Sequence, residues 1–288
     1  MDFQNKDGVF TLYECPRCSV QFWVPFSNPG KDWYEEGDTY SPSQLIKPKV
    51  SRGYHKKFLE RWGDKKGKTI LDVGCGAGEF LAALQARGWN VWGVDFDRRA
   101  IQAAKRHFRL DQVFAMELGK FFKDVETPQF DVITCFEVIE HVDDPRKLME
   151  NIQNKLHPGG KVILSTPSRE RFFANLNTWD FPPNHLTRWN KEAVARLLRP
   201  FGFEPTFVVY VEQFRILLES FNGKFSLGLV AKAQAVSKKS SQSITKGAIF
   251  LGKAKALLIG ALPAAVFYLL GMVQKRKNGG LYLEFERA

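Results

Sequence analysis

Two carboxylates and an imidazole stand close together near the middle of the chain. Glu137, Glu140 and His141 are spaced so that a helical turn starting here would place all three on one face. Such a group can supply a general base for a hydroxyl acceptor, with Glu137 and His141 as the candidates, or it can hold a divalent cation. A hydrogen-bonded structural role is the third interpretation of His141.

A glycine-rich turn follows a buried apolar run earlier in the sequence. Gly74, Gly76 and Gly78 allow tight turning and bring backbone N–H groups close to a ligand. Asp95 ends the next apolar run, where a carboxylate can accept both hydroxyls of a ribose. Asp72, just before the glycines, would repel a pyrophosphate and suits a cationic ligand with an amino-acid end. This pattern argues against a nicotinamide dinucleotide.

The elements that must position these residues alternate between strands and helices from Lys68 to about Tyr210. This alternation is typical of a parallel sheet with crossover helices. We predict an α/β, doubly wound, mostly parallel seven-stranded sheet whose last strand lies at 281–286. The other predicted strands are Thr69–Val73, Val91–Asp95, Gln112–Ala115, Asp131–Phe136, Lys161–Thr166 and Phe203–Tyr210, and the helices are Glu79–Arg87, Arg98–Phe108, Pro145–Leu156 and Lys191–Leu198, with a lead-in helix within 45–66.

The motif Asp72-x-Gly74-x-Gly76-x-Gly78 with a later Asp95 resembles that of the class I S-adenosylmethionine-dependent methyltransferases. The resemblance covers residues 68–210, about half of the chain, and implies a Rossmann-like fold, an enzyme and S-adenosylmethionine as cofactor. For Glu117 an ordinary solvated helix position is an equal alternative to a ligand. The implied cofactor-binding residues are Asp72, Gly74, Cys75, Gly76, Gly78, Asp95, Phe96, Met116, Glu117 and Phe136.

The Glu-x-x-Glu-His run resembles that of two branches of this family, the ubiquinone-biosynthesis O-methyltransferases and the small-RNA 2′-O-methyltransferases. Both branches bind magnesium or another divalent ion there, and the RNA branch adds a later histidine, whose counterpart here is His185. We predict Glu137, His141 and His185 as the catalytic residues. We predict no metal site, and a divalent cation held by these three residues and Glu140 stays the alternative.

Residues 1–44 are rich in aromatic residues, Pro and Gly, and we predict a small irregular N-terminal lobe. Its Cys15 and Cys18 resemble half of the zinc ribbon that precedes methyltransferases acting on glycans. Cys75 and Cys135 are committed to the cofactor region, so we expect a degenerate lobe without zinc. Four cysteines without a disulfide framework and an acidic N-terminus indicate a cytoplasmic protein.

The net charge of +11 is concentrated in one segment. Residues 220–282 contain ten Lys and Arg and no Asp or Glu, so the rest of the chain is close to neutral. Ala256–Val273 is an uncharged run of eighteen residues. A single crossing would separate the last two strands, so we expect helices that lie on an anionic membrane surface or pack on the protein. We therefore divide the chain into the lobe 1–44, a methyltransferase domain 45–212, a helical insertion 213–279 and the last strand 280–288.

From these observations we predict an S-adenosylmethionine-dependent O-methyltransferase that acts on a small-molecule, lipid-linked or glycan acceptor, peripheral on a membrane. RNA 2′-O-methylation is one alternative, but the basic residues alternate with Ser and apolar groups and not with aromatics, which disfavours nucleic-acid binding. A non-catalytic cofactor-binding scaffold at a membrane is the other alternative. The oligomeric state does not follow from the sequence.

Overall fold

The computed structural model of the chain describes residues 1–5, 7–26, 30, 52–171, 174, 180–212 and 279–287. The chain divides into two compact units, the first of residues 1–169, 174–211 and 280–288 and the second of 170–173 and 212–279. Nearly all described residues belong to the first unit. The predicted insertion at 213–279, with the apolar run Ala256–Val273, lies outside the described residues except for Gly279.

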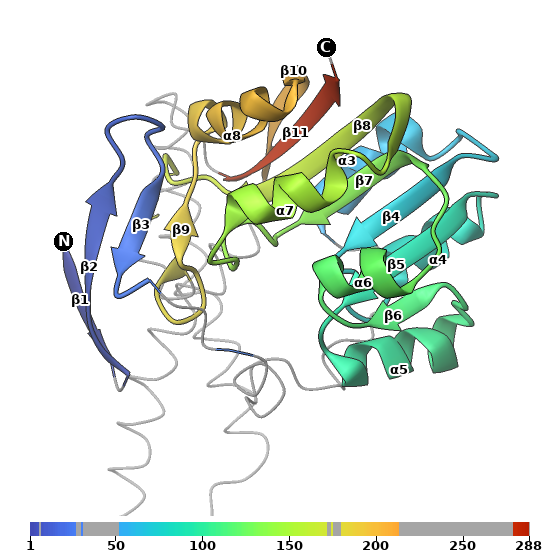
Figure 1. Ribbon diagram of the computed structural model, residues 1–288, viewed down its shortest axis with the longest axis horizontal. Helices are drawn as coiled ribbons and strands as arrows, with labels where there is room; N and C mark the ends of the chain where they lie inside the picture. Colours follow the sequence, from blue (N-terminus) through green and yellow to red (C-terminus); the bar gives the residue numbers. More distant parts are fainter. Residues whose placement is uncertain are drawn as a thin grey trace, which may run out of the picture. The chain divides into compact units, whose positions relative to one another are not determined.

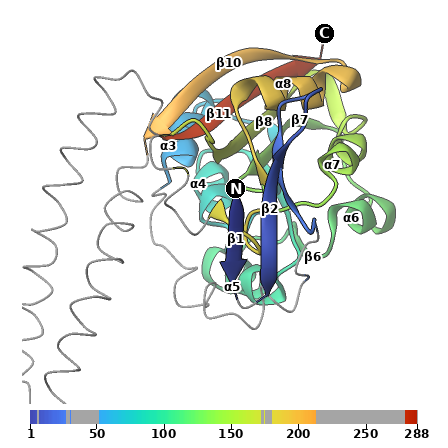
Figure 2. The same cartoon turned by 90° about the vertical axis from the view of Figure 1, so that its left-hand side faces the viewer.

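The main sheet has seven strands in the order β10-β11-β8-β7-β4-β5-β6. Neighbours from β8 to β6 pair in parallel, and β11 pairs antiparallel with β8. Figure 2 shows β10 and β11 running together along one edge. This topology confirms the predicted doubly wound, mostly parallel sheet. Its strands are β4 Thr69–Val73, β5 Asn90–Asp95, β6 Val113–Ala115, β7 Phe130–Phe136, β8 Leu156–Pro167, β10 Phe203–Glu212 and β11 Gly279–Arg287.

Helices cover both faces of the sheet (Figure 1). One hydrophobic cluster joins the sheet to α6, α7 and α8, and the other joins it to α3, α4 and α5. The alternation of side chains along a strand feeds both clusters, since Ile70 lies in one and Leu71 and Val73 in the other. The helices are α3 Gly53–Trp62, α4 Glu79–Gln85, α5 Arg98–Phe108, α6 Leu118–Asp124, α7 Pro145–Ile152 and α8 Lys191–Leu198.

The N-terminal residues form a second, four-stranded sheet in the order β1-β2-β3-β9. Its strands are β1 Asp2–Asn5, β2 Gly8–Glu14, β3 Gln21–Val24 and β9 Thr187–Arg188. The prediction of an irregular lobe was therefore wrong for residues 2–24. Phe10 on β2 and Trp23 on β3 are buried in one small cluster, whereas the other residues of β1, β2 and β3 are half-buried or exposed, so these short strands give no clear alternation in the sequence.

Among the helices that the structure describes, none is both long and apolar enough to span a membrane.

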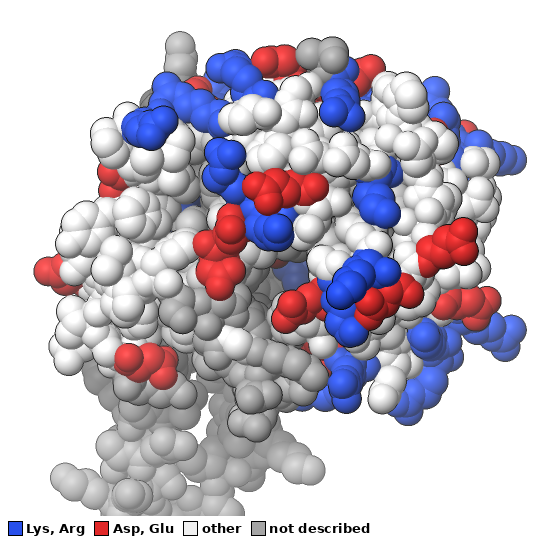
Figure 3. All heavy atoms as spheres, in the orientation of Figure 1, with Lys and Arg blue, Asp and Glu red and all other residues white. Residues whose placement is uncertain are grey.

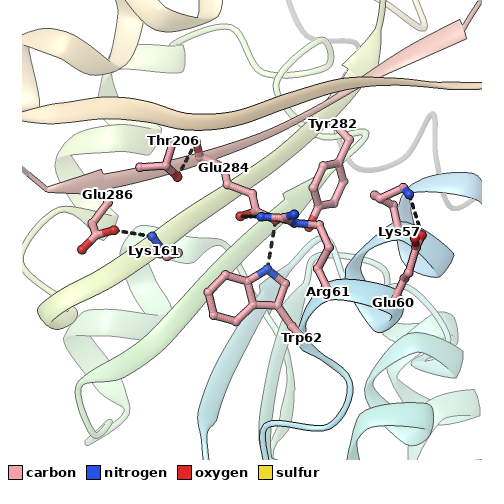
Figure 4. A network of polar contacts seen from close by, with 9 residues as sticks. All are labelled: Lys57, Glu60, Arg61, Trp62, Lys161, Thr206, Tyr282, Glu284 and Glu286. Carbon is pink, nitrogen blue, oxygen red and sulfur yellow. Dashed lines mark hydrogen bonds and ion pairs between the residues drawn. The ribbon is translucent and has the colours of Figure 1, made fainter.

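The last strand is tied to the lead-in helix by a buried carboxylate (Figure 4). Glu284 on β11 is 1% exposed and accepts two hydrogen bonds from Arg61 on α3, at 2.6 and 3.1 Å. Trp62 Nε1 and the Tyr282 hydroxyl donate to the same carboxylate at 2.9 and 3.0 Å. The bonds from Arg61 and Trp62 join segments more than 200 residues apart in the chain.

We expect Glu284→Gln to lower the free energy of unfolding by about 2–4 kcal/mol, because the amide cannot accept four charge-assisted bonds and leaves Arg61 without its counter-ion. The guanidinium is 35% exposed, which keeps the cost below that of a fully buried charge. Denaturant unfolding measures the change. Glu286→Gln is the control, since Glu286 pairs with Lys161 but is 40% exposed, and a loss as large as that of Glu284→Gln would contradict this account.

Candidate functional site

The glycine turn between β4 and α4 has an unusual backbone. Gly74, Gly76 and Gly78 have φ angles of +76°, +54° and +81°, where an L-residue is strained. A Cβ at Gly74 would lie 2.6 Å from Val138 Cγ2, and one at Gly78 would lie 2.5 Å from Leu110 Cδ1. A Cβ at Gly76 would meet no protein atom within 4 Å. Gly74 and Gly78 are thus needed for packing, while the turn leaves space beside Gly76.

Asp95 ends β5 beside this turn. Its Oδ2 accepts from the Gly76 N–H at 2.9 Å and its Oδ1 from the Asp97 N–H at 2.9 Å. Burial raises the pKa of the Asp95 carboxyl, and these two hydrogen bonds oppose the rise. The predicted ribose-binding carboxylate is therefore held against the space beside Gly76, at the carboxyl edge of the sheet where ligands of doubly wound folds bind.

Asp72 is the most buried acid of the turn, with 3% of its surface exposed. The Thr134 hydroxyl donates to its Oδ1 at 2.6 Å. Burial raises the pKa of Asp72 to about 7, although the bond from Thr134 lowers it. A cationic group bound nearby would stabilise the ionised form, as the sequence predicted for the amino-acid end of a ligand.

Asp72 predicts a pH dependence of ligand binding. Because its pKa in the folded protein is raised, the stability that it contributes is complete below its ordinary pKa and is lost as the pH rises through about 7. A ligand ammonium group prefers the ionised carboxylate, so the affinity for S-adenosylhomocysteine will rise about tenfold between about pH 6 and pH 8. Calorimetric titration measures it, and Asp72→Asn will bind weakly with a flat profile. An equally steep rise in Asp72→Asn would assign the dependence to another group.

The remaining predicted cofactor residues lie around the ends of β5, β6 and β7. Phe96 is 39% exposed directly after Asp95, and the Met116 N–H donates to the Asp95 carbonyl at 2.9 Å. Met116 is half-buried, and Glu117 is exposed at the start of α6. Cys75 is buried, so its side chain packs inward beneath the turn.

Phe136 was predicted as a cofactor-binding residue. It is 6% exposed and lies in the hydrophobic cluster beneath α3, with its ring 5.2 Å from that of Tyr54. Burial and the nearby Glu137 raise the pKa of the Tyr54 phenol, and Glu140 and Asp72 add to the rise. Tyr54, which was not among the predicted site residues, thus contacts Phe136, the neighbour of Glu137 in the chain. In the sequence, the position of Tyr54 in the predicted lead-in helix was the only indication of its role.

The predicted helical turn at Glu137 is absent. Glu137 has a φ of +55°, which is incompatible with a right-handed helical turn. Residues 137–141 form a non-helical turn after β7. The Glu137 N–H donates to the Ser165 carbonyl at 3.0 Å, and its carboxylate accepts from the Ser165 hydroxyl at 3.0 Å. Its side chain is thus held toward β8. Strained backbone of this kind costs about 1–3 kcal/mol and concentrates at functional sites.

The other three predicted residues do come together. Ligand atoms of Glu140, His141 and His185 all lie within 4.8 Å of one another, and Glu137 does not belong to this group. The two imidazole rings are 4.6 Å apart and meet edge to face. His185 Nδ1 lies 3.4 Å from Asp180 Oδ1, a buried acid that the sequence analysis missed although it stands five residues before His185. Val138, in the same turn as Glu140, packs over Gly74, so this cluster adjoins the glycine turn.

The hydrogen bond of His141 identifies its tautomer. Its Nδ1 lies 2.7 Å from the Asn184 carbonyl, which can only accept, so Nδ1 carries the proton and the lone pair of the neutral ring is on Nε2. Burial and the adjacent His185 lower the pKa of His141 to about 3. The ring is therefore neutral at physiological pH. A neutral imidazole suits a metal ligand, whereas so low a pKa makes a weak general base.

The N-terminal cysteines lie in the turn between β2 and β3. A backbone hydrogen bond from Cys18 lowers the pKa of the Cys15 thiol, while burial raises that of Cys18. Within the described residues, no cluster of three or more His, Cys, Asp or Glu side chains includes this pair. The absence of zinc from the lobe stays a prediction.

Comparisons with known proteins agree with this geometry. A family model described as a methyltransferase domain matches residues 47–207. The chain is 33% identical over 196 residues to a ubiquinone biosynthesis O-methyltransferase of Coxiella burnetii, covering 60% of this chain and 80% of that protein. It is 42% identical over 107 residues to the mitochondrial ubiquinone biosynthesis O-methyltransferase of Schizosaccharomyces pombe, covering 36% and 39%.

Solved structures share the fold. An S-adenosylmethionine-dependent methyltransferase from Archaeoglobus fulgidus matches with a TM-score of 0.51 at 14% identity, over 89% of this chain and 97% of that one. A [4+2]-cyclase, SpnF, matches with a TM-score of 0.52 at 18% identity, over 81% and 79%. Since these identities are low, the structural likeness defines the fold, and the family model and the curated relatives define the protein class.

Proposed function

The chain belongs to the class I S-adenosylmethionine-dependent methyltransferases, and from this premise we propose that it methylates a ring hydroxyl of a small, quinone-like acceptor. The observation that carries the proposal is the Glu140–His141–His185 cluster, which adjoins the glycine turn through Val138 and Gly74. The relatives from C. burnetii and S. pombe are both O-methyltransferases by name. A methyl donor site beside two histidines and an acid is suited to a hydroxyl that must lose a proton.

The residues around the glycine turn fit S-adenosylmethionine. The space beside Gly76 would admit the ligand, Asp95 would bind the ribose hydroxyls, and Asp72 would face the ammonium group of the methionine part. The bound cofactor supplies an electrophilic methyl group on a sulfonium. The acceptor oxygen would take this methyl group as the S–C bond breaks and leaves a neutral thioether, and the hydroxyl proton would pass to the Glu140–His141–His185 cluster. The protein contributes mainly positioning and a path for that proton.

The cluster also fits a divalent cation. Glu140 is 1% exposed, His141 is neutral with its lone pair on Nε2, and Asp180 lies beside His185 as outer carboxylates do in metal sites. Glu140, His141 and His185 would hold the ion, without Glu137. A bound cation would lower the pKa of the acceptor hydroxyl. This assignment agrees better with the low pKa of His141 than a role as general base.

The experiment that tests the function is an acceptor screen with wild-type protein. Purified protein is incubated with S-adenosylmethionine and a panel of catechols, phenols, amines and RNA, and products are identified by mass spectrometry. We expect a methyl ether of a ring hydroxyl. Transfer only to an amine or to RNA would overturn the proposal, as would cofactor binding without turnover on every acceptor and in membrane extracts.

The two alternatives have less support. The relatives that match are named for small-molecule O-methylation, which does not favour RNA or a scaffold role. The face shown in Figure 3 intersperses Lys and Arg with Asp and Glu, and does not present a continuous basic surface of the kind that binds nucleic acid.

The basic segment supports a membrane-surface location. Ala256–Val273 is uncharged and is flanked by Lys253, Lys255 and the run 275–277, and each such cation contributes about 1 kcal/mol near an anionic surface. We expect the protein to sediment with vesicles containing about one third phosphatidylglycerol and not with pure phosphatidylcholine, and to dissociate as salt is raised. Equal binding to both vesicle types, or to neither, would contradict this prediction.

A further inference from the structure

The segment 180–188 lies between the methyltransferase core and the N-terminal sheet. On the core side, the backbone N–H groups of Leu186 and Thr187 donate to the Glu140 carbonyl at 2.8 and 3.2 Å. The Asn184 carbonyl accepts from His141 Nδ1 at 2.7 Å. Both partners on the core side thus belong to the cluster that carries the proposed function.

On the other side, the same segment is part of the N-terminal sheet. Thr187 and Arg188 form β9, which pairs antiparallel with β3 and lies beside it in Figure 1. The backbone N–H of Trp23 donates to the Leu186 carbonyl at 3.1 Å. The Asn5 side-chain amide donates to the Pro182 carbonyl at 2.9 Å, a bond between residues 177 positions apart.

The Phe181 side chain anchors the start of the segment. It is 5% exposed, with its ring 4.8 Å from that of Phe3 and 5.4 Å from that of Trp23. With Phe10 these rings form a cluster separate from the two that cover the main sheet. The sheet β1–β3 therefore supplies the hydrophobic packing around this ring.

Only a short turn separates this anchor from His185. The N–H groups of Asn184 and His185 both donate to the Phe181 carbonyl, at 3.1 and 3.2 Å. Asp180, next to Phe181, is 4% exposed and lies 3.4 Å from His185 Nδ1. A shift of the Phe181 ring therefore moves both the histidine and its acid.

We propose that the N-terminal lobe is a positioning element of the active site, which holds Asp180 and His185 in place opposite Glu140 and His141. This inference rests on the proposed function only in assigning chemistry to that cluster. The lobe acts through Asn5 and Trp23, which hydrogen-bond Pro182 and Leu186, and through its packing around the Phe181 ring. The lobe that contains Cys15 and Cys18, which resembles half of a zinc ribbon, thus stabilises the position of the residues proposed to act on the acceptor.

The test compares Phe181→Ala and Asn5→Ala with the control Tyr13→Ala. Tyr13 lies on β2 and is 50% exposed, outside the Phe181 cluster. In both test variants we expect kcat to fall, by roughly 10- to 100-fold in Phe181→Ala and less in Asn5→Ala, because small misplacements of catalytic groups cost this much. The Kd for S-adenosylhomocysteine should stay within about twofold, since the hydrogen bonds that hold Asp72, Gly76 and Asp95 involve Thr134 and Asp97 and neither of the residues changed.

Two readouts do not depend on activity. The chain has five histidines, so the ring resonances of His141 and His185 can be assigned and compared at one fixed pH. We expect both to shift in the test variants and not in Tyr13→Ala. Amide exchange at Leu186 and Thr187 should accelerate in parallel.

Unchanged histidine resonances and amide exchange in Asn5→Ala and in folded Phe181→Ala would overturn the proposal. Loss of cofactor affinity in proportion to kcat would overturn it too, because the lobe would then support the whole fold. If Phe181→Ala does not fold, Asn5→Ala decides. If the histidine resonances and amide exchange change in the variants but the wild-type protein has no O-methyltransferase activity, the positioning role stands and the proposed function is refuted.

Discussion

Gly76→Ala will weaken the binding of S-adenosylhomocysteine by roughly 10- to 100-fold, because an added methyl in a filled site costs about 1–3 kcal/mol. The methyl would enter the space beside Gly76, where the structure places no protein atom within 4 Å and where we propose that the ligand lies. Calorimetric titration measures the loss. We expect the substitution to lower mainly the affinity for the ligand, because the new methyl group meets no protein atom and strains only the backbone at residue 76.

Gly67→Ala is a close match as control. Gly67 also has a positive φ, +78°, and a Cβ added there would also meet no protein atom within 4 Å, but it precedes β4 at the opposite end of the strand. Both substitutions therefore cost about 1–2 kcal/mol of backbone strain. Thermal unfolding should show similar destabilisation in the two variants, while only Gly76→Ala loses affinity. Equal losses of affinity would mean that strain, and not occupancy of the site, explains the effect.

The sheet could be predicted because its strands are buried apolar runs, and because β4 leads into the glycine turn and β5 ends in Asp95. The bounds of β4, α5 and α8 agree with those predicted, and Asp95 does end β5 beside the glycine turn. In the structure, Asp97 and Asn190 cap α5 and α8 by accepting hydrogen bonds from their first turns, which fits the observed starts of these helices. Local sequence and global fold agree in this part of the chain.

Short or irregular elements were missed. The helix α6, Leu118–Asp124, was not predicted; it has only seven residues and contains Gly119, whereas the equally short α4 contains no glycine. The predicted helix Pro145–Leu156 ends at Ile152, and Leu156 already begins β8 with a register shift against β7. Pro158, Gly159 and Gly160 thus lie in an irregular strand start, where Gly159 has a φ of +73°.

The active-site geometry depended on features that local rules cannot give. A non-glycine residue rarely adopts positive φ, so no pattern predicts it at Glu137, and the expected helical face was wrong for that reason. Trp23 gains its place through contacts between distant parts of the chain, such as the hydrogen bond from its backbone N–H to the Leu186 carbonyl. The candidate residues Glu140, His141 and His185 could be named together from the sequence, but the exclusion of Glu137 from their cluster could not be predicted.

Glu140→Gln will reduce kcat on the ring-hydroxyl acceptor by roughly 100-fold or more, because it removes the one carboxylate of the cluster, and electrostatic groups at a reacting centre contribute this much. Glutamine keeps the volume of the side chain, and the backbone carbonyl that binds Leu186 and Thr187 is unaltered. The fold and the cofactor site should therefore persist. Affinity for Mn²⁺, measured by electron paramagnetic resonance, should fall by at least about tenfold in the same variant.

Glu137→Gln is the informative comparison, since Glu137 was predicted with Glu140 as a catalytic or ligand residue. The structure places its carboxylate on the Ser165 hydroxyl, 3.0 Å away and outside the cluster. A glutamine can keep a hydrogen bond to Ser165, so we expect kcat to fall less than about tenfold and Mn²⁺ affinity to stay unchanged. A larger loss in Glu137→Gln than in Glu140→Gln would mean that the turn rearranges when ligands bind and brings Glu137 into the site. Equal Mn²⁺ affinity in the wild type, Glu140→Gln and Glu137→Gln would exclude a divalent cation at the Glu140–His141–His185 cluster. The cluster would then act in proton transfer alone.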